Sequence, residues 1–271
     1  MRILFLPGNH KFPLEALKLL WAKDVEIVGC VIDSSIEYLK EMSVFCKDHN
    51  INILTTQEVY DNIENLNFEI AYSVFYPKII KRPIIENCKI ACINFHPAPL
   101  PQYRGVASMC FGVLNQIDYW EVTAHFIEDE TIDTGKVIMT KRIEVKPGDT
   151  PYHIEKRLYK KEIEIFEDVT NLILEQNLEN INAYYPKGQG KYYSKKDYIK
   201  ARKIDLMQDK GEIIAKKVKA FWFPKTAGVA RIELDGKEFG LIDMDIMQEI
   251  KRQYVTEHFS RNADTCEKGD S

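Results

Sequence analysis

Near the middle of this 271-residue chain, an apolar segment from Lys89 to Phe95 runs into Asn94-Phe95-His96-Pro97-Ala98-Pro99-Leu100-Pro101-Gln102-Tyr103-Arg104-Gly105. If the apolar segment is a strand, its alternation points the side chains of Asn94 and His96 to the same face. The three prolines that follow fix φ and remove backbone N–H donors, so this loop is neither a helix nor an interior strand. The run predicts a strand that ends in a stiff loop, with Leu100-Pro101 as a candidate cis peptide bond.

An amide, an imidazole and a carboxylate suit acyl transfer to an amine. His96 can accept a proton near neutral pH. Asn94 can donate an amide N–H to an oxyanion, an interaction worth roughly 2.7–4 kcal/mol when the donor is preorganised. The downstream run Ile132-Asp133-Thr134-Gly135 adds a carboxylate that can hold the tautomer of the imidazole. The Asn-x-His spacing alone is weak, because a histidine after a strand is more often a hydrogen-bonded structural residue.

The segments before this run alternate between predicted strands and helices. Arg2 to Leu6 is an apolar β-type run, and Val25 to Ile32 has the nearly continuous apolar character of a strand buried on both faces. Further strands are predicted at Ile51 to Leu54 and Phe68 to Val74, and helices at Pro13 to Ala22, Ile36 to His49 and Gln57 to Asn65. This alternation predicts an α/β fold with a Rossmann-like, doubly wound, mostly parallel sheet, whose ligands lie beyond the carboxyl ends of the strands.

The first such strand ends in Pro7-Gly8-Asn9-His10, which is not the Gly-x-Gly-x-x-Gly fingerprint of dinucleotide-binding folds. Two interpretations of this turn stay open. Asn9 and His10 face a substrate at the end of the strand, or His10 only caps the helix that follows.

The second half of the chain predicts a helix at Ala107 to Asn115 and strands at Val122 to Ile127 and Val137 to Ile143. We interpret His125, which lies in an apolar run, as structural. A long helix is predicted from Pro151 to about Gln176, another helix at Glu212 to Ala220, and a hairpin at Val229 to Ile242 around the Asp235-Gly236 turn. We predict a catalytic domain at 1–185, a linker and small β-containing domain at 186–257, and a polar, disordered tail at 258–271.

The linker region, Tyr184 to Tyr198, is rich in tyrosine and lysine. Aromatic rings with interleaved cations can stack a base and neutralise a pyrophosphate, but packed tyrosines with solvated lysines are an equal alternative. The aromatic run at Phe221 and Trp222 is similarly open between a small core and part of a nucleotide pocket.

The composition is that of an ordinary globular protein. A formal net charge of −4 argues against a general polyanion-binding surface. The six cysteines lack the paired short spacings of zinc sites, so no metal is predicted. The chain shows neither a signal sequence nor an apolar run long enough to span a bilayer, so we expect a cytoplasmic protein that does not bind membranes.

The Asn94 to Gly105 run, followed in order by Ile132-Asp133-Thr134-Gly135, resembles the signature of the folate-dependent formyltransferases. That family includes enzymes that act on methionyl-tRNA, glycinamide ribonucleotide and nucleotide sugars. The resemblance covers about the first two-thirds of the chain. It implies that Asn94, His96 and Asp133 are the catalytic residues and that 10-formyltetrahydrofolate is the formyl donor.

The resemblance also implies ligand contacts. The donor-binding candidates lie on two turns: Tyr76, Lys78, Ile79, Glu128, Asp129 and Glu130. The acceptor-binding candidates are Asn9, His10, Tyr103, Arg104, Gly105, Tyr192, Tyr193, Lys195, Phe221 and Trp222. We expect Arg104 to anchor its loop as well.

Three functions are weighed. The preferred one is formylation of the primary amine of a nucleotide-linked amino-dideoxy sugar, with a dTDP-linked 3-amino or 4-amino sugar as the commonest case, for surface polysaccharide such as lipopolysaccharide O-antigen. This protein would bind folate and a nucleotide sugar, but no nucleic acid, and form a homodimer. Methionyl-tRNA formylation ranks second, because it should need a larger, basic second domain. A non-catalytic binding module ranks third, because the Asn94, His96 and Asp133 set is intact.

Overall fold

The computed structural model describes residues 1–23, 25–175, 180–224 and 228–252. The predicted tail at 258–271, the predicted helix end at Gln176 and residues 225–227 lie outside the described residues.

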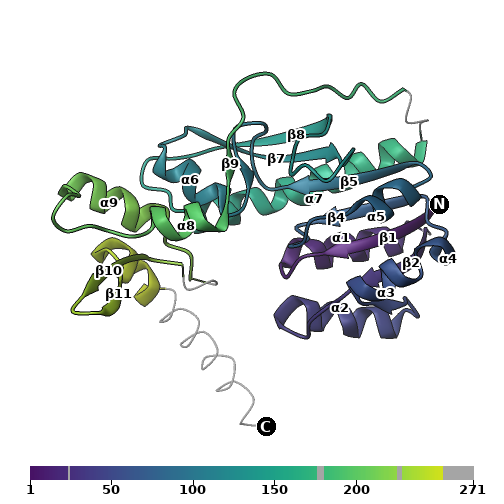
Figure 1. Ribbon diagram of the computed structural model, residues 1–271, viewed down its shortest axis with the longest axis horizontal. Helices are drawn as coiled ribbons and strands as arrows, with labels where there is room; N and C mark the ends of the chain where they lie inside the picture. Colours follow the sequence, from purple (N-terminus) through teal and green to yellow (C-terminus); the bar gives the residue numbers. More distant parts are fainter. Residues whose placement is uncertain (24, 176–179, 225–227, 253–271) are drawn as a thin grey trace, which may run out of the picture.

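A seven-stranded, mixed but mostly parallel sheet forms the centre of the fold, in the order β3-β2-β1-β4-β5-β7-β8 (Figure 1). The first five strands in that order pair in parallel, whereas β7 pairs antiparallel with both β5 and β8. The strands are β1 (Arg2–Pro7), β2 (Glu26–Val31), β3 (Ile53–Leu54), β4 (Ile70–Val74), β5 (Ala91–His96), β7 (Tyr119–Phe126) and β8 (Val137–Glu144). The α/β fold with a mostly parallel sheet is confirmed.

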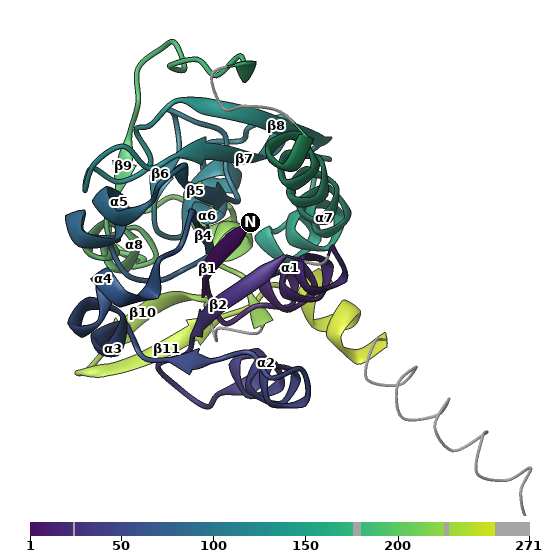
Figure 2. The same ribbon diagram turned by 90° about the vertical axis from the view of Figure 1, so that its right-hand side faces the viewer.

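Helices cover both faces of the sheet, as Figure 2 shows. The helices are α1 (Lys11–Ala22), α2 (Glu37–Asp48), α3 (Thr56–Asp61), α4 (Ile63–Leu66), α5 (Arg82–Asn87), α6 (Ser108–Leu114) and α7 (Pro151–Glu175). The predicted single helix at Gln57 to Asn65 is wrong, because Asn62 ends α3 with a non-helical φ of −122° and α4 begins after it.

The alternation of side chains along β1 and β5 decides which helices pack where. Ile3 and Phe5 of β1 point into a cluster shared with α1, α2 and α7, whereas Leu4 and Leu6 point into a second cluster shared with α3 to α5. This period of two is the reason that continuous apolar runs become strands with two buried faces.

A smaller part follows the sheet domain. It contains β9 (Tyr192–Tyr193), α8 (Lys195–Ala201), α9 (Gly211–Ala220) and the hairpin β10 (Ala230–Leu234) and β11 (Lys237–Leu241). The predicted linker is partly ordered structure, because Ser194 and Asp197 form a capping box that starts α8. β9 pairs in parallel with β6 (Arg104–Gly105), which lies in the loop after β5.

Among the described residues, no helix combines the length and the apolar character that a bilayer crossing needs. The five described cysteines are free thiols, and all but Cys88 are buried.

Candidate active site

Three neighbouring strands place a row of polar side chains on one face of the sheet. Asn94 of β5 pairs in register with Ser73 of β4 on one side and with His125 of β7 on the other. Residues opposite each other in a sheet share a face, so these three side chains meet. Ser73 Oγ donates to Asn94 Oδ1 at 2.7 Å, and Asn94 Nδ2 lies 3.0 Å from His125 Nε2. The amide of Asn94 is therefore held in one orientation from both sides.

Asp133 reaches this row from the loop between β7 and β8. Its backbone is left-handed, with φ of 54°, a conformation that aspartate tolerates better than most residues. Two residues on, the loop passes close to β7, because a Cβ on Gly135 would lie 1.9 Å from the Phe126 carbonyl oxygen. Asp133 Oδ1 accepts from Asn94 Nδ2 at 3.2 Å, and Oδ2 accepts from the Gly105 N–H at 2.8 Å.

His96 lies one pleat beyond Asn94 and is buried. Its Nε2 is 2.8 Å from the backbone oxygen of Tyr103, which can only accept, so Nε2 carries the proton. Nδ1 faces Asp133 Oδ2 at 3.6 Å. The predicted role of Asp133 in holding the tautomer of the imidazole is wrong, because the Tyr103 carbonyl holds it. Asp133 lies where it can stabilise a positive charge on Nδ1.

The environment keeps Asp133 ionised. Burial raises the pKa of its carboxyl, but the positive charge that His96 carries when protonated and the N–H of Gly105 together lower the pKa well below the usual range of aspartate. A buried carboxylate with this many partners supplies a fixed negative charge beside Nδ1 of His96.

His125 is the site residue that sequence reasoning missed, since its apolar surroundings suggested a structural role. Its Nδ1 donates to the Phe126 carbonyl at 2.8 Å, which leaves Nε2 free to accept from Asn94. Nε2 also lies 3.4 Å from Asp133 Oδ1, but the shorter contact to Asn94 favours the acceptor role. Only the register of β5 against β7 reveals this contact.

At the end of β1, His10 has both ring nitrogens engaged. Nδ1 accepts from the Phe12 N–H and caps α1, and Nε2 pairs with Glu155 at 2.6 Å. The capping interpretation of His10 is therefore the correct one, and its predicted substrate contact finds no free nitrogen. Asn9 beside it is exposed.

The first group of predicted donor-binding residues follows β4, whose carboxyl end lies beside that of β1. Lys78 Nζ bonds Asp33 at 2.7 Å and Thr56 at 3.0 Å, and Tyr76 OH lies 2.5 Å from Thr56 Oγ1. Ile79 is 53% exposed and open to a ligand.

The second donor-binding turn has three exposed carboxylates. Glu128 accepts from Tyr185 OH, Asp129 from the Thr131 N–H, and Glu130 from the Arg82 N–H.

Several predicted acceptor contacts are corrected by burial. Phe221 is fully buried against Cys110 of α6, and Trp222 is 8% exposed, so the aromatic run is a small core. Tyr103 and Tyr193 are buried as well, and their rings face each other in a stack. These four side chains offer no free surface to a substrate.

Other acceptor candidates remain accessible. Tyr192 and Lys195 are exposed, and the Gly105 N–H is used by Asp133. In the described part of the chain, the guanidinium of Arg104 forms no hydrogen bond or ion pair, and its buried Nε has no partner. Arg104 therefore does not anchor its loop through the side chain. The Leu100-Pro101 bond of this loop is cis, as predicted.

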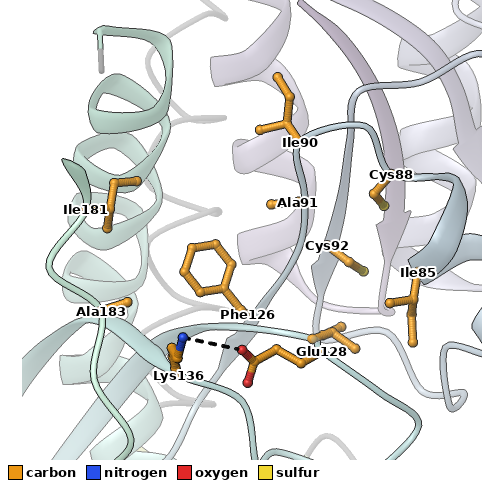
Figure 3. A pocket seen from close by; sticks show the side chains of 11 residues that line it. Ile85, Cys88, Ile90, Ala91, Cys92, Phe126, Glu128, Lys136, Ile181 and Ala183 are labelled. Atoms are coloured by element: carbon orange, nitrogen blue, oxygen red, sulfur yellow. Dashed lines mark ion pairs between the residues drawn. The ribbon is translucent and has the colours of Figure 1, made fainter. Parts of the chain in front are cut away.

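A cavity of about 450 Å³ lies around the start of β5, where Ala91 and Cys92 line it, and no residue of the cluster is among its lining residues (Figure 3). Most of the residues that line it are apolar, and Glu128 and Lys136 form an ion pair at 4.0 Å within it. Cys92, which lines it, is two residues before Asn94 on β5, so both side chains belong to the same face of the sheet. Among the described residues, no group of three or more histidine, cysteine or carboxylate side chains is placed to hold a metal ion.

A family model described as formyl transferase matches residues 39–170. The chain contains a formyl transferase domain. The three residues of the resembling signature, Asn94, His96 and Asp133, all lie inside this formyl transferase domain.

Similar sequences are methionyl-tRNA formyltransferases. The protein from Caldicellulosiruptor saccharolyticus is 27% identical over 139 residues, which are 48% of this chain and 44% of that protein. The protein from Wolbachia pipientis subsp. Culex pipiens is 26% identical over 258 residues, covering 90% and 81%. The chain thus spans less than half the length of the first relative.

Similar solved structures are sugar N-formyltransferases. A 4-N formyltransferase from Francisella tularensis superposes with a TM-score of 0.73 at 21% identity, over 89% of this chain and 96% of that chain. A sugar 3-N-formyltransferase solved with dTDP and 5-N-formyltetrahydrofolate superposes with a TM-score of 0.66 at 25% identity, over 88% and 84%.

Proposed function

We propose that this protein transfers the formyl group of 10-formyltetrahydrofolate to the primary amine of a nucleotide-linked amino-dideoxy sugar. The observation that carries the proposal is the cluster of Asn94, His96 and Asp133 at the carboxyl end of β5, in which the ionised carboxylate of Asp133 lies 3.2 Å from the amide of Asn94 and 3.6 Å from the imidazole of His96. This set matches the needs of a tetrahedral transition state at a formyl carbon.

His96 would take the proton that the amine loses as its nitrogen bonds to the formyl carbon. Nδ1 carries the free lone pair, because Nε2 donates to the Tyr103 carbonyl. The resulting imidazolium would face the Asp133 carboxylate at 3.6 Å. The proton thus moves from the amine to a base whose charged form already has a partner.

Asn94 would stabilise the negative charge that develops on the formyl oxygen. Its Nδ2 now serves His125 at 3.0 Å and Asp133 at 3.2 Å. The contact with Asp133 is the longer one, so it is the contact that a substrate oxygen would replace. Ser73 and His125 would keep the amide plane in place during this exchange, which is the preorganisation that such donors require.

The residues present fit a folate donor. The cavity of about 450 Å³ at the start of β5 has room for a bicyclic ring. Cys92 lines it and Asn94 lies two residues on along the same face, about 6.6 Å further at the strand repeat. A ring in the cavity would thus bring an attached formyl group toward Asn94. When bound, the folate would supply an activated formyl carbon, and the proton that His96 takes from the amine would pass to N10 as the C–N10 bond breaks.

A nucleotide sugar fits the acceptor side better than a tRNA. The chain has 37 Lys and Arg against 41 Asp and Glu, and the exposed cations Lys191, Lys195 and Lys196 lie close together in the sequence around Tyr192. That compact group suits one pyrophosphate and one ring, whereas tRNA binding uses many phosphate contacts. The superposition with the dTDP-bound sugar enzyme over 88% of this chain supports a dTDP-linked 3-amino or 4-amino sugar. Such a product belongs to surface polysaccharide synthesis, such as that of lipopolysaccharide O-antigen.

Methionyl-tRNA formylation is the second candidate. It is favoured by the sequence relative from Wolbachia, which is aligned over 81% of its own length. It predicts a strong fall of activity with salt, because counterions compete for each phosphate contact.

Two assays test the proposal. The protein is incubated with 10-formyltetrahydrofolate and either a dTDP-linked amino sugar or charged initiator tRNA, at low and at physiological salt. Formylated sugar with mild salt dependence supports the proposal, and formylated tRNA at a comparable rate overturns the choice of acceptor. Thermal shifts with dTDP, UDP and GDP then identify the nucleotide, because a ligand raises the melting temperature of the state it binds.

A further inference from the structure

Strand β9 ties the smaller C-terminal part to the loop that follows the candidate catalytic strand. It pairs in parallel with β6, with Arg104 opposite Tyr192 and Gly105 opposite Tyr193. Backbone bonds run from Arg104 N to Lys191 O at 3.0 Å and from Val106 N to Tyr193 O at 2.9 Å. The pairing of these two short strands thus joins segments that are almost 90 residues apart in the chain.

The same pairing holds Asp133. The Gly105 N–H that donates to Asp133 Oδ2 at 2.8 Å belongs to β6, so its direction depends on where β9 holds this strand. The fit is close, because a Cβ on Gly105 would lie 2.4 Å from the Tyr193 carbonyl oxygen. With φ of 90°, Gly105 also has a conformation that other residues rarely adopt.

The Tyr193 ring is also linked to His96, through its packing on Tyr103. The ring is 3% exposed and stacks between Phe111, with centroids 4.0 Å apart, and Tyr103, at 5.8 Å. Asn115 Nδ2 donates to both tyrosine hydroxyls at 3.3 Å. The backbone oxygen of Tyr103 is the acceptor that fixes the tautomer of His96.

We infer that Tyr193 is a positioning residue for the transfer reaction, which acts on His96 through Tyr103 and on Asp133 through Gly105. This inference rests on the proposed function and replaces the predicted contact between the Tyr193 ring and the acceptor. Misplacement of a catalytic group by about 1 Å can cost about 100-fold in rate, so a residue that sets two such groups should affect turnover.

The test compares Tyr193→Leu with Tyr198→Leu. Tyr198 lies in the same segment, but its ring contacts Phe221 at 5.7 Å and the guanidinium of Arg202 at 5.1 Å instead of stacking on Tyr103, so it is a control for lost aromatic packing. We expect Tyr193→Leu to lower kcat about 10- to 100-fold and to keep the acceptor KM within about threefold of the wild-type value. Tyr198→Leu should keep kcat within about twofold of the wild-type value, at a similar loss of melting temperature.

A milder variant keeps the test valid if Tyr193→Leu does not fold. Tyr193→Phe retains the stacked ring and loses only the bond from Asn115, so we expect a fall in kcat of about two- to fivefold. An unchanged kcat with a raised acceptor KM in either Tyr193 variant would mean that the ring contacts substrate, which overturns the inference.

A readout without turnover separates this inference from the proposed function. In protein with ¹⁵N-labelled histidine, NMR reports which ring nitrogen of His96 carries the proton. We expect the Nε2-protonated form in the native protein and a larger share of the Nδ1-protonated form in the Tyr193 variants. Unchanged His96 signals in both Tyr193 variants would overturn the inference, whereas an inactive wild-type protein with shifted His96 signals would overturn only the proposed reaction.

Discussion

The charged group in the cluster around Asp133 is buried, whereas those of the C-terminal hairpin are exposed to solvent. Asp133 is 9% exposed and lies within 3.6 Å of four polar groups, from Asn94, His96, Gly105 and His125. In the hairpin, the pair between Arg231 and Glu238 lies at the surface and one side chain of it is 52% exposed. Removing a partner from a buried charge costs several kcal/mol, whereas most surface pairs contribute about 0–1 kcal/mol. Electrostatic effects on activity should therefore decrease from the cluster to the hairpin.

The largest effect is expected at the two side chains that would meet the substrate. His96→Ala or Asn94→Ala should lower kcat by about two to four orders of magnitude, since each removes a proton acceptor or an oxyanion donor. Formyl-transfer rates measured with both substrates saturating check this, with the melting temperature as control for folding. A double variant that keeps most of its activity would remove these residues from the mechanism.

Asp133→Asn should have the next largest effect, about two to three orders of magnitude in kcat, because the imidazolium of His96 loses its counter-charge. It should also change the dependence of stability on pH. The lowered pKa means that the native state favours the ionised carboxyl. This contribution is complete above the pKa of an unfolded aspartate, about 3.9, and is lost as pH falls toward the lower native value. Denaturant unfolding at several acidic pH values should therefore show a shallower loss of stability in Asp133→Asn than in the wild-type protein. Equal slopes would contradict a depressed pKa.

His125→Leu should lower kcat by about 10- to 100-fold, because the amide of Asn94 loses one of the contacts that hold it. His125→Gln is the matched control, since its amide oxygen can still accept from Asn94 and should restore part of the rate. If both variants were equally active and close to wild type, His125 would be only a packed residue of β7.

Lys195→Ala should raise the acceptor KM by about three- to tenfold and leave kcat nearly unchanged, because an exposed cation would contribute binding rather than chemistry. Initial rates at varied acceptor concentration check this at two salt concentrations. Lys210→Ala, at the start of α9, is a comparison for loss of a lysine away from the basic group. A change in kcat without a change in KM would show that Lys195 acts on the chemical step, like the residues of the cluster around Asp133.

The smallest effect is expected in the hairpin. Arg231→Gln should change the free energy of unfolding by less than about 1 kcal/mol and leave kcat unchanged, because its partner Glu238 is well solvated. Urea unfolding measures the free energy, and one steady-state assay of formyl transfer measures kcat. A large loss of activity here would show that the hairpin is coupled to the site and would break the comparison.

The sequence predicted the sheet domain well because the signals there are local. Continuous apolar runs at β1, β2 and β4 and the helical periodicity between them depend only on neighbouring residues, and the structure confirms these elements within a few positions. The cis bond at Pro101 also followed from local chemistry. The prediction of a linker is less accurate than that of the sheet domain, because a capping box of Ser194 and Asp197 starts a helix within the tyrosine- and lysine-rich segment.

By itself, the sequence determined the fold class, because alternating apolar runs act over short distances, and its resemblance to the formyltransferase signature indicated the three residues of the proposed catalytic set. Only the tertiary structure decided what holds them. The pairing of β4, β5 and β7 brought Ser73 and His125 to Asn94, and the Tyr103 carbonyl rather than Asp133 accepts the hydrogen bond that fixes the tautomer of His96. The pairing of β6 with β9 buried Tyr193 behind the site. Register and burial are properties of contacts between distant segments, so no local pattern in the chain could specify them.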